Sequence, residues 1–191
     1  SLLELLVPSP KPERTYDALV QTYLWREGKL YSRYPPGFPA LLALAGFVGG
    51  ETAQHWLNPL LYLTILVVLG VVTWEAVRPN DRVLAAGSAV AAMWLLLLLP
   101  TDVHLWGITV ARDLPTHLLA LLSLLAALRR RWVLAGLALG AACTIRPDAV
   151  LYGVSLGVLF RIERGGLRDA LLGAVAFLVG ALPLFAYNTV T

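Results

Sequence analysis

The feature that most constrains this chain is a succession of apolar segments separated by short loops that carry arginine. The segments expected to be helical cover residues 36–48, 54–77, 83–99, 114–128, 132–145, 147–160 and 167–187. A helix needs about 20 residues to cross about 30 Å of hydrocarbon. Residues 54–77 and 167–187 reach that length, 83–99 approaches it, and the other segments are shorter. This pattern predicts a bundle of apolar helices, some of which cross a membrane only part of the way.

The composition supports a location in lipid. The 191 residues are 58% hydrophobic and 14% charged, whereas a soluble domain carries about 25% charged residues. The apolar runs are unbroken rather than alternating, which argues against a membrane β-barrel. We therefore expect an all-α polytopic protein that passes several times through the bacterial cytoplasmic (inner) membrane. Because the chain starts at Ser1 without methionine, we also expect it to be part of a longer protein.

The basic residues predict the orientation of the helices. They punctuate the apolar runs instead of forming a patch with aromatic residues, so we expect no nucleic-acid partner. Loops rich in arginine stay on the cytoplasmic side of a membrane. Three clusters hold eight arginines: Arg78 and Arg82; Arg129, Arg130 and Arg131; Arg161, Arg164 and Arg168. The loops 101–113 and 144–148 then lie outside, where they carry only Arg112 and Arg146.

This orientation divides the chain into two parts. Residues 1–35 form an extracytoplasmic loop with an amphipathic helix near Tyr16–Trp25, and residues 36–191 form a transmembrane helical module. Residues 36–48 are expected to be a re-entrant or surface-lying helix, because 54–77 must run from outside to inside. Pro147 lacks a backbone N–H and biases Arg146 away from helix. We therefore expect residues 132–160 to dip into the membrane and return, with a break at "IRPD".

Two short motifs have a structural interpretation. "GVSLG" (153–157) fits the G-x-S-x-G pattern, but a nucleophile elbow needs a strand before it and a helix after it. This one lies inside an apolar segment, so we interpret it as a small-residue packing element, as in G-x-x-x-G. "GLALG" (136–140) has the same interpretation.

Ionisable residues gather on the predicted outer side, and at membrane depth such residues are costly and usually functional. The candidates are Glu13, Asp17, Arg33, Asp102, His104, Arg112, Asp113, His117, Arg146 and Asp148. Asp113 also suits the N-terminus of a helix, and His117 suits a hydrogen bond between helices. Arg146 and Asp148 also suit a local ion pair that braces the break. A weak metal-site pattern combines Asp102, His104, Asp113 and His117.

Arg33 precedes the proline-rich helix start "YPPGFP", where free backbone N–H groups favour an anion. Gly37 and Phe38 would supply most of these N–H groups, because proline supplies none. A lipid phosphate contact is one interpretation of Arg33. The other is an arginine that reaches toward the membrane surface between the interfacial aromatics Tyr31 and Tyr34.

The order of these features resembles the N-terminal half of GT-C superfamily glycosyltransferases of the family 39-like group. That group includes protein O-mannosyltransferases and the lipid A aminoarabinose transferase. The resemblance rests on "ERTYDALVQTYLWREGKLYSRYPPGFPALLAL", "ARDLPTHLLALL" and "RRWVLAGLALGAACTIRPDAVL". It implies a GT-C-like transmembrane bundle with re-entrant or juxtamembrane helices, and sugar transfer from a polyprenyl-phosphate donor at the extracytoplasmic face.

The resemblance also implies roles for individual residues. Asp113 matches the second acidic residue of the family, and Pro12 stands where the first motif has an aspartate. Either Glu13 or Asp17 then serves as the general base, or catalysis has been lost. The implied substrate-binding residues are Arg33, Tyr34, Arg112, Arg146 and Asp148. A divalent metal ion stays open as a cofactor.

The leading hypothesis is therefore a membrane glycosyltransferase or a part of one. The alternative is a non-catalytic GT-C-like subunit that acts as a scaffold or lipid-binding component beside other membrane subunits. A transporter or channel is less favoured, because no inverted repeat is visible and the charges collect at one face.

Overall fold

A computed structural model describes residues 23–26, 29–32, 35–98, 113–163 and 165–190. Its first elements are the strands β1 (Tyr23–Arg26) and β2 (Lys29–Ser32), which pair antiparallel. The helix expected near Tyr16–Trp25 is wrong over residues 23–25, because these belong to β1, and its earlier part lies outside the described residues. Aromatic residues favour strands, and Tyr23, Trp25 and Tyr31 lie in β1 and β2.

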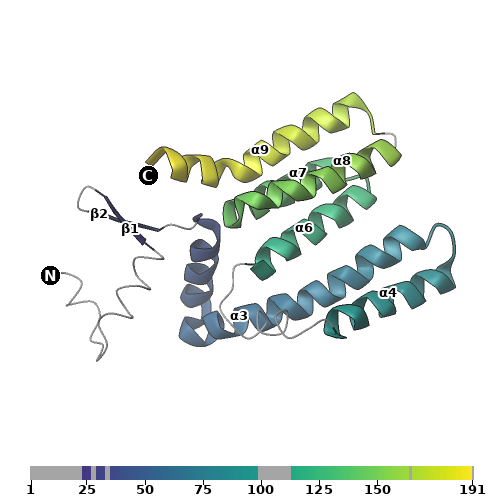
Figure 1. Ribbon diagram of the computed structural model, residues 1–191, viewed down its shortest axis with the longest axis horizontal. Helices are drawn as coiled ribbons and strands as arrows, with labels where there is room; N and C mark the ends of the chain where they lie inside the picture. Colours follow the sequence, from purple (N-terminus) through teal and green to yellow (C-terminus); the bar gives the residue numbers. More distant parts are fainter. Residues whose placement is uncertain (1–22, 27–28, 33–34, 99–112, 164, 191) are drawn as a thin grey trace.

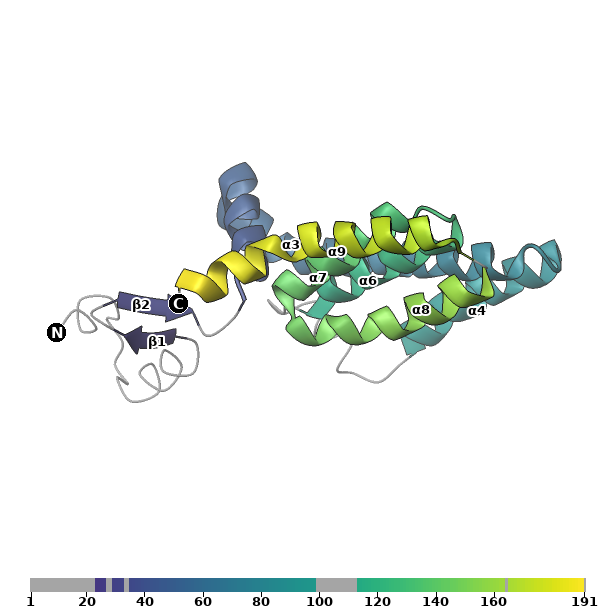
Figure 2. The same ribbon diagram turned by 90° about the horizontal axis from the view of Figure 1, so that it is seen from above.

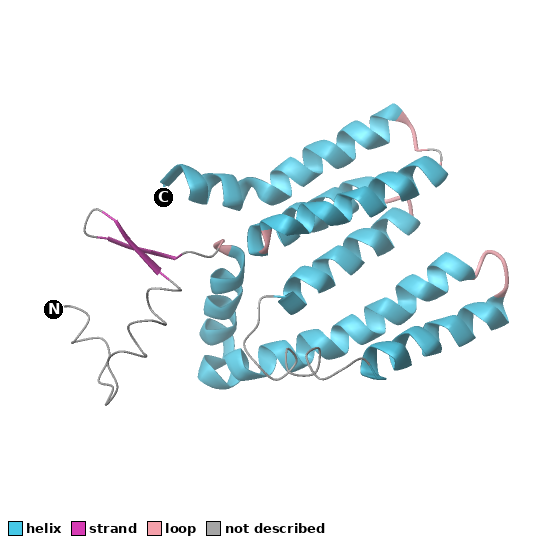
Figure 3. Cartoon of the chain, viewed as in Figure 1, coloured by secondary structure: helices cyan, strands magenta, loops and turns pink. Residues whose placement is uncertain are grey.

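The rest of the described chain is helical, as predicted, and Figures 1 and 3 show short turns between α3 and α4 and between α6 and α7. The helices are α3 (Gly37–Val77), α4 (Arg82–Leu98), α6 (Asp113–Leu128), α7 (Trp132–Ile145), the 3-10 helix η1 (Pro147–Leu151), α8 (Tyr152–Ile162) and α9 (Leu167–Val190). Their bounds agree with those of the expected segments to within a few residues, and α9 extends three residues beyond the expected end at 187. Two differences concern how the segments are divided: α3 joins the expected segments 36–48 and 54–77, and the expected segment 147–160 is divided into η1 and α8.

A sharp bend divides α3 into two arms. Gly49 and Gly50 leave the helical conformation, and Gly50 has a φ of 63° and a ψ of −156°, a region that is essentially restricted to glycine. Gln54 donates a hydrogen bond from Nε2 to the carbonyl oxygen of Leu42 (3.0 Å) across the bend. The arm before the bend stands at a steep angle to the arm after it (Figure 1). The prediction that residues 36–48 form an element of their own is therefore confirmed.

The helices α4, α3, α6, α7 and α9 lie side by side in this order, and each packs against the next. The short helix α8 leaves this layer and packs on one face of it, against α6 (Figure 2). All residues of α8 are described, and none of them is buried. The layer has little core, so many large apolar side chains point outward along α3, α4, α8 and α9.

Glycines allow α7 and α9 to approach each other closely. A methyl group at Gly136 would collide with the carbonyl oxygen of Gly173, and one at Gly140 with that of Phe177. From the other side, a Cβ at Gly180 would lie 2.5 Å from the carbonyl oxygen of Leu137. The interpretation of "GLALG" as a packing element is confirmed, since only residues without a side chain permit this contact.

"GVSLG" behaves differently. It lies inside α8 and follows a 3-10 helix, so it is no nucleophile elbow. Its interpretation as a packing motif is wrong for Gly157, because a Cβ there meets no atom of the described chain within 4 Å. Gly153 has ordinary contact with Leu139 (3.5 Å). The reason is that α8 lies at the outside of the layer, where none of the described helices covers Gly157.

The arginine clusters meet at one end of the bundle, as predicted. Their described members lie in or directly beside the loops that join α3 to α4, α6 to α7 and α8 to α9 (Figure 1). Glu75, whose side chain is only 10% exposed, binds Arg129 (2.9 Å) and Arg78 (3.0 Å), and Arg130 binds Glu163 (2.8 Å). The pair Glu75–Arg129 ties α3 to the start of the α6–α7 loop.

The close contact of α7 and α9 predicts that a side chain at Gly140 destabilises the fold. Replacing Gly140 with Ala should lower the free energy of unfolding by about 1–3 kcal/mol, because the new methyl group overpacks the contact. Gly157→Ala is the control, and it should leave stability unchanged or slightly increase it, because alanine is the better helix former. Thermal unfolding of both variants in detergent checks this. Equal effects would contradict the described packing.

Candidate functional site

The candidate site begins at the first turn of α6. Asp113 is the first helical residue, and Leu114, Pro115 and Thr116 behind it are buried. A carboxylate is favoured at this place by the positive end of the helix dipole, and proline is tolerated in a first turn. The helix start therefore holds Asp113 at the end of the bundle opposite the arginine clusters (Figure 1).

The second part of the site is the break between α7 and η1, which confirms the one predicted at "IRPD". Arg146 is extended, with a φ of −139° and a ψ of 115°. Its N–H still donates to the carbonyl oxygen of Ala142 (2.9 Å), and its own carbonyl oxygen accepts from Ala149 (3.0 Å). Pro147 causes the break, because it disfavours helix at the residue before it. The backbone thus changes direction while its hydrogen bonds at this point are kept.

The side chain of Arg146 joins these two parts. It donates from Nε to Oδ1 of Asp148 (3.0 Å) and from Nη2 to Oδ2 of the same residue (2.7 Å), which makes a bidentate ion pair. It also donates from Nη1 to Oδ1 of Asp113 on α6. The ion pair expected to brace the break is confirmed, and Asp113 is a second partner that the spacing did not predict. We call Asp113, Arg146 and Asp148 the acidic–arginine cluster.

Electrostatics and exposure define what the acidic–arginine cluster can do. The hydrogen bonds to Asp148 and Asp113 raise the pKa of Arg146 above its ordinary value, so the guanidinium stays charged. The side chains are 19% exposed at Asp113, 34% at Arg146 and 55% at Asp148. Solvent or a ligand can therefore reach carboxylate oxygens whose positions are fixed by the guanidinium. Such an arrangement can accept hydrogen bonds from hydroxyl groups in a defined direction.

One turn further along α6, His117 contacts Tyr152 of α8. The Tyr152 hydroxyl and Nδ1 of His117 share a hydrogen bond of 2.9 Å, and the two rings meet edge to face at 6.2 Å. The interpretation of His117 as an interhelical residue is confirmed. Tyr152 was not among the predicted site residues. Its position four residues after Asp148 could have indicated it, because residues about one helical turn apart lie on the same face.

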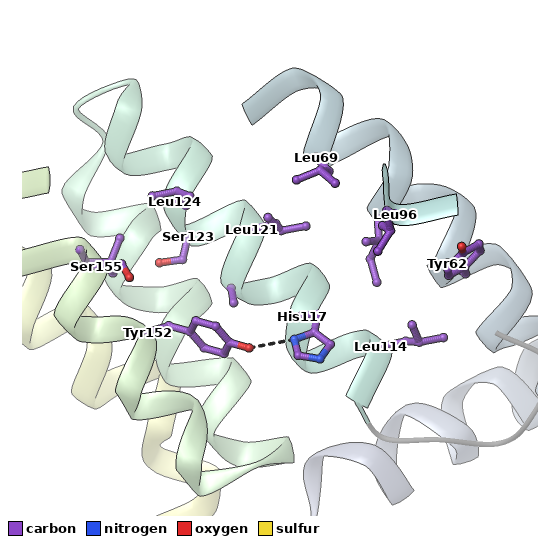
Figure 4. A pocket seen from close by; sticks show the side chains of 13 residues that line it. Tyr62, Leu69, Leu96, Leu114, His117, Leu121, Ser123, Leu124, Tyr152 and Ser155 are labelled. Carbon is purple, nitrogen blue, oxygen red and sulfur yellow. Dashed lines mark hydrogen bonds between the residues drawn. The ribbon is translucent and has the colours of Figure 1, made fainter. Parts of the chain in front are cut away.

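The same pair lies at a cavity of about 380 Å³ between α3, α4, α6 and α8. Figure 4 shows His117 and Tyr152 turned toward each other, with leucines from α3, α4 and α6 around the remaining space. Ser123 also faces the cavity, but its hydroxyl donates to the carbonyl oxygen of Ala135 (2.7 Å) and is buried. The lining is therefore mainly apolar, and three of its polar residues, His117, Ser123 and Tyr152, make hydrogen bonds within the chain.

The beginning of α3 reaches this end of the bundle as well. A Cβ at Gly37 would lie 2.6 Å from Oγ1 and 2.7 Å from the carbonyl oxygen of Thr144, two residues before Arg146. Gly37 thus permits the "PPG" helix start to pack against the end of α7. Sequence positions far apart, at the starts of α3 and α6 and at the end of α7, meet here.

Part of the predicted site can be placed and part cannot. The structure brings together Asp113, Arg146 and Asp148, with His117 one turn away. Seven further candidates lie outside the described residues: Glu13, Asp17, Arg33, Tyr34, Asp102, His104 and Arg112. Within the described ranges, no group of three or more His, Cys, Asp or Glu side chains could hold a metal ion. Of the four residues in the weak metal-site pattern, only Asp113 and His117 are described, and Asp113 already accepts a hydrogen bond from Arg146.

Comparisons of the chain with protein-family models, curated proteins and solved structures give no match.

The acidic–arginine cluster makes a second prediction. Arg146→Ala leaves Asp113 without its cation, and Asp113→Asn removes the charge that Arg146 faces. A double-mutant cycle of these two changes should give a coupling of about 0.5–3 kcal/mol in the free energy of unfolding, as expected for residues in direct contact. The control cycle combines Arg168→Ala with Asp113→Asn, two changes at opposite ends of the bundle, which should be additive. Additive effects in the first cycle as well would contradict the contact.

Proposed function

We propose that the chain is a membrane-embedded module of a glycosyltransferase that uses a polyprenyl-phosphate-linked sugar donor at the extracytoplasmic face of a bacterial cytoplasmic membrane. The observation that carries the proposal is the acidic–arginine cluster at one end of an otherwise apolar bundle. Ionisable side chains at the depth of a membrane are costly, and where they occur they usually mark a functional site.

The outward-facing side chains support the membrane location. Among the described residues, α3 and α9 are long and apolar enough to cross a membrane, and only 22% and 11% of their most apolar stretches are buried. A central helix of a soluble protein would be mostly buried instead. Leu44, Phe47 and Trp94 are examples of large side chains that are more than half exposed. Lipid is the solvent in which such a surface is favourable.

The difference between the two ends supports the orientation. The arginine clusters gather at one end, which the positive-inside rule assigns to the cytoplasm. The acidic–arginine cluster lies at the opposite end and would face the outside. A lipid-linked donor on that side would present its sugar and phosphate at the level of the cluster, with its hydrocarbon in the membrane.

In this proposal the residues share the work of sugar transfer. Asp113, oriented by Arg146, accepts a hydrogen bond from a hydroxyl of the sugar or of the acceptor. Arg146 adds positive charge near the phosphate that leaves, together with Arg33 and Arg112. Tyr34 and Asp148 contribute further substrate contacts. The general base is Glu13 or Asp17, and such a base is typically worth about 10²- to 10⁴-fold in rate.

One observation favours the second candidate, a non-catalytic GT-C-like subunit. All three nitrogens of Arg146 donate to the chain's own carboxylates, which leaves this arginine less available to an anion. An arginine so used is sufficient to brace the chain break without any substrate. The subunit would then act as a scaffold or lipid-binding component beside other membrane subunits.

Sugar transfer from a labelled polyprenyl-phosphate donor in membranes that contain the protein distinguishes the two candidates. The enzyme hypothesis predicts that Asp113→Asn lowers the rate by about 10²-fold or more, and Glu13→Gln tests the proposed base. The matched control is Asp169→Asn, which removes a carboxylate at the opposite end and should retain activity. Equal transfer by Asp113→Asn, Glu13→Gln and the wild type would overturn the catalytic roles, and absence of transfer by the wild type would favour the subunit.

A further inference from the structure

The cavity between α3, α4, α6 and α8 is large enough for a hydrocarbon chain. Its volume is about 380 Å³, and an apolar cavity of about 150 Å³ already admits a six-carbon ring. Leu69, Leu96 and Leu121 reach toward the open space from three different helices (Figure 4). Left empty, such a space would deprive these side chains of packing partners, which destabilises a helix bundle.

Water fits this cavity poorly. A buried water needs two to four polar partners, and most of the lining is leucine and alanine. Of its polar lining residues, His117, Tyr152 and Ser123 already make hydrogen bonds within the chain, and Tyr62 and Ser155 are the other two. The cavity therefore favours an apolar occupant.

The surroundings favour an occupant that comes from the bilayer. The helices that border the cavity carry large exposed apolar side chains, such as Leu95 on α4 and Val154 on α8, so the outer surface around it is apolar as well. In the proposed orientation a lipid chain beside these helices reaches the cavity without passing through water.

Charge complementarity fixes which way an amphiphile would lie. His117 and Tyr152 lie beside the acidic–arginine cluster, whose two carboxylates and one guanidinium carry a net charge of −1, and Asp148 is the most exposed of its three side chains. The ammonium group of a zwitterionic head group would find its partner in the exposed carboxylate of Asp148, while the acyl chain extends between the leucines. The opposite order would bring the head group among apolar side chains.

We propose that this cavity holds one acyl chain of a zwitterionic bilayer phospholipid, with its head group at the His117–Tyr152 end. The cavity offers the inner part of a chain mainly apolar contacts, so the lipid present in greatest excess occupies it by mass action. The bound chain fills the space between the α3–α4 hairpin and the helices α6 and α8. This inference depends on the membrane location but not on sugar transfer.

Photo-crosslinking of the protein in nanodiscs tests the proposal. The probe is phosphatidylethanolamine with a diazirine on one acyl chain, and labelled peptides are identified by mass spectrometry. We expect peptides of α6 and α8 that line the cavity to be labelled more strongly than the lipid-facing peptide of α9 around Leu178, which serves as the internal standard. Uniform labelling of all lipid-facing helices would overturn the proposal, whether or not any variant folds.

A cavity-filling variant provides the matched comparison. Ala120→Phe places a ring in the cavity, whereas Ala91→Phe places the same ring on the exposed side of α4. The first should lose most of the excess labelling, and the second should retain it. Loss of labelling on addition of polyprenyl phosphate in slight molar excess would assign the cavity to the donor lipid instead. Because binding is read without sugar transfer, an inactive protein that still shows the labelling pattern would contradict only the proposed function.

Discussion

The described structure depends on the interruption of the backbone at Arg146 and Pro147. Proline removes one helical N–H and forces the residue before it into an extended conformation. The chain can then leave the helix layer, so that α8 lies on the face of α6 and a cavity opens between them. Arg146 stabilises the break through two ion pairs, one with Asp148 in the same turn and one with Asp113 on the neighbouring helix α6. One side chain therefore fixes both the local turn and the position of two helices.

The bundle that results has two chemically different ends and an apolar surface between them. At one end arginines pair with Glu75 and Glu163, and at the other end one arginine lies between two carboxylates. The middle is held by close backbone contact at Gly136 and Gly140 instead of a large buried core. In lipid, where apolar burial drives helix association only weakly, small residues and polar links are the expected means of assembly. Charged side chains are costly in the apolar middle of such a bundle, which agrees with the position of the candidate site at one end.

The sequence predicted the helices well because each depends on local features: apolar run length, arginine in the loops, and proline or glycine at the breaks. It predicted the gathering of Asp113, Arg146 and Asp148 at one end, since helix direction follows from the loops. It did not predict that Asp113 binds Arg146, or that Tyr152 binds His117, because both contacts depend on the lateral order of the helices. The packing role predicted for Gly157 was wrong for the same reason. The hairpin was not predicted, because its strands are only four residues long.

The position of the two ends relative to a membrane tests the proposed orientation most directly. Single cysteines replace Glu51, near the end that carries the acidic–arginine cluster, or Asn80, in the arginine-rich turn, in a protein whose Cys143 is changed to Ala. Both positions are exposed. A membrane-impermeant maleimide should label the cysteine at 51 in intact cells and the cysteine at 80 only after permeabilisation. Labelling at 80 in intact cells, or equal labelling at both positions, would contradict the proposed membrane orientation and with it the outer-face site.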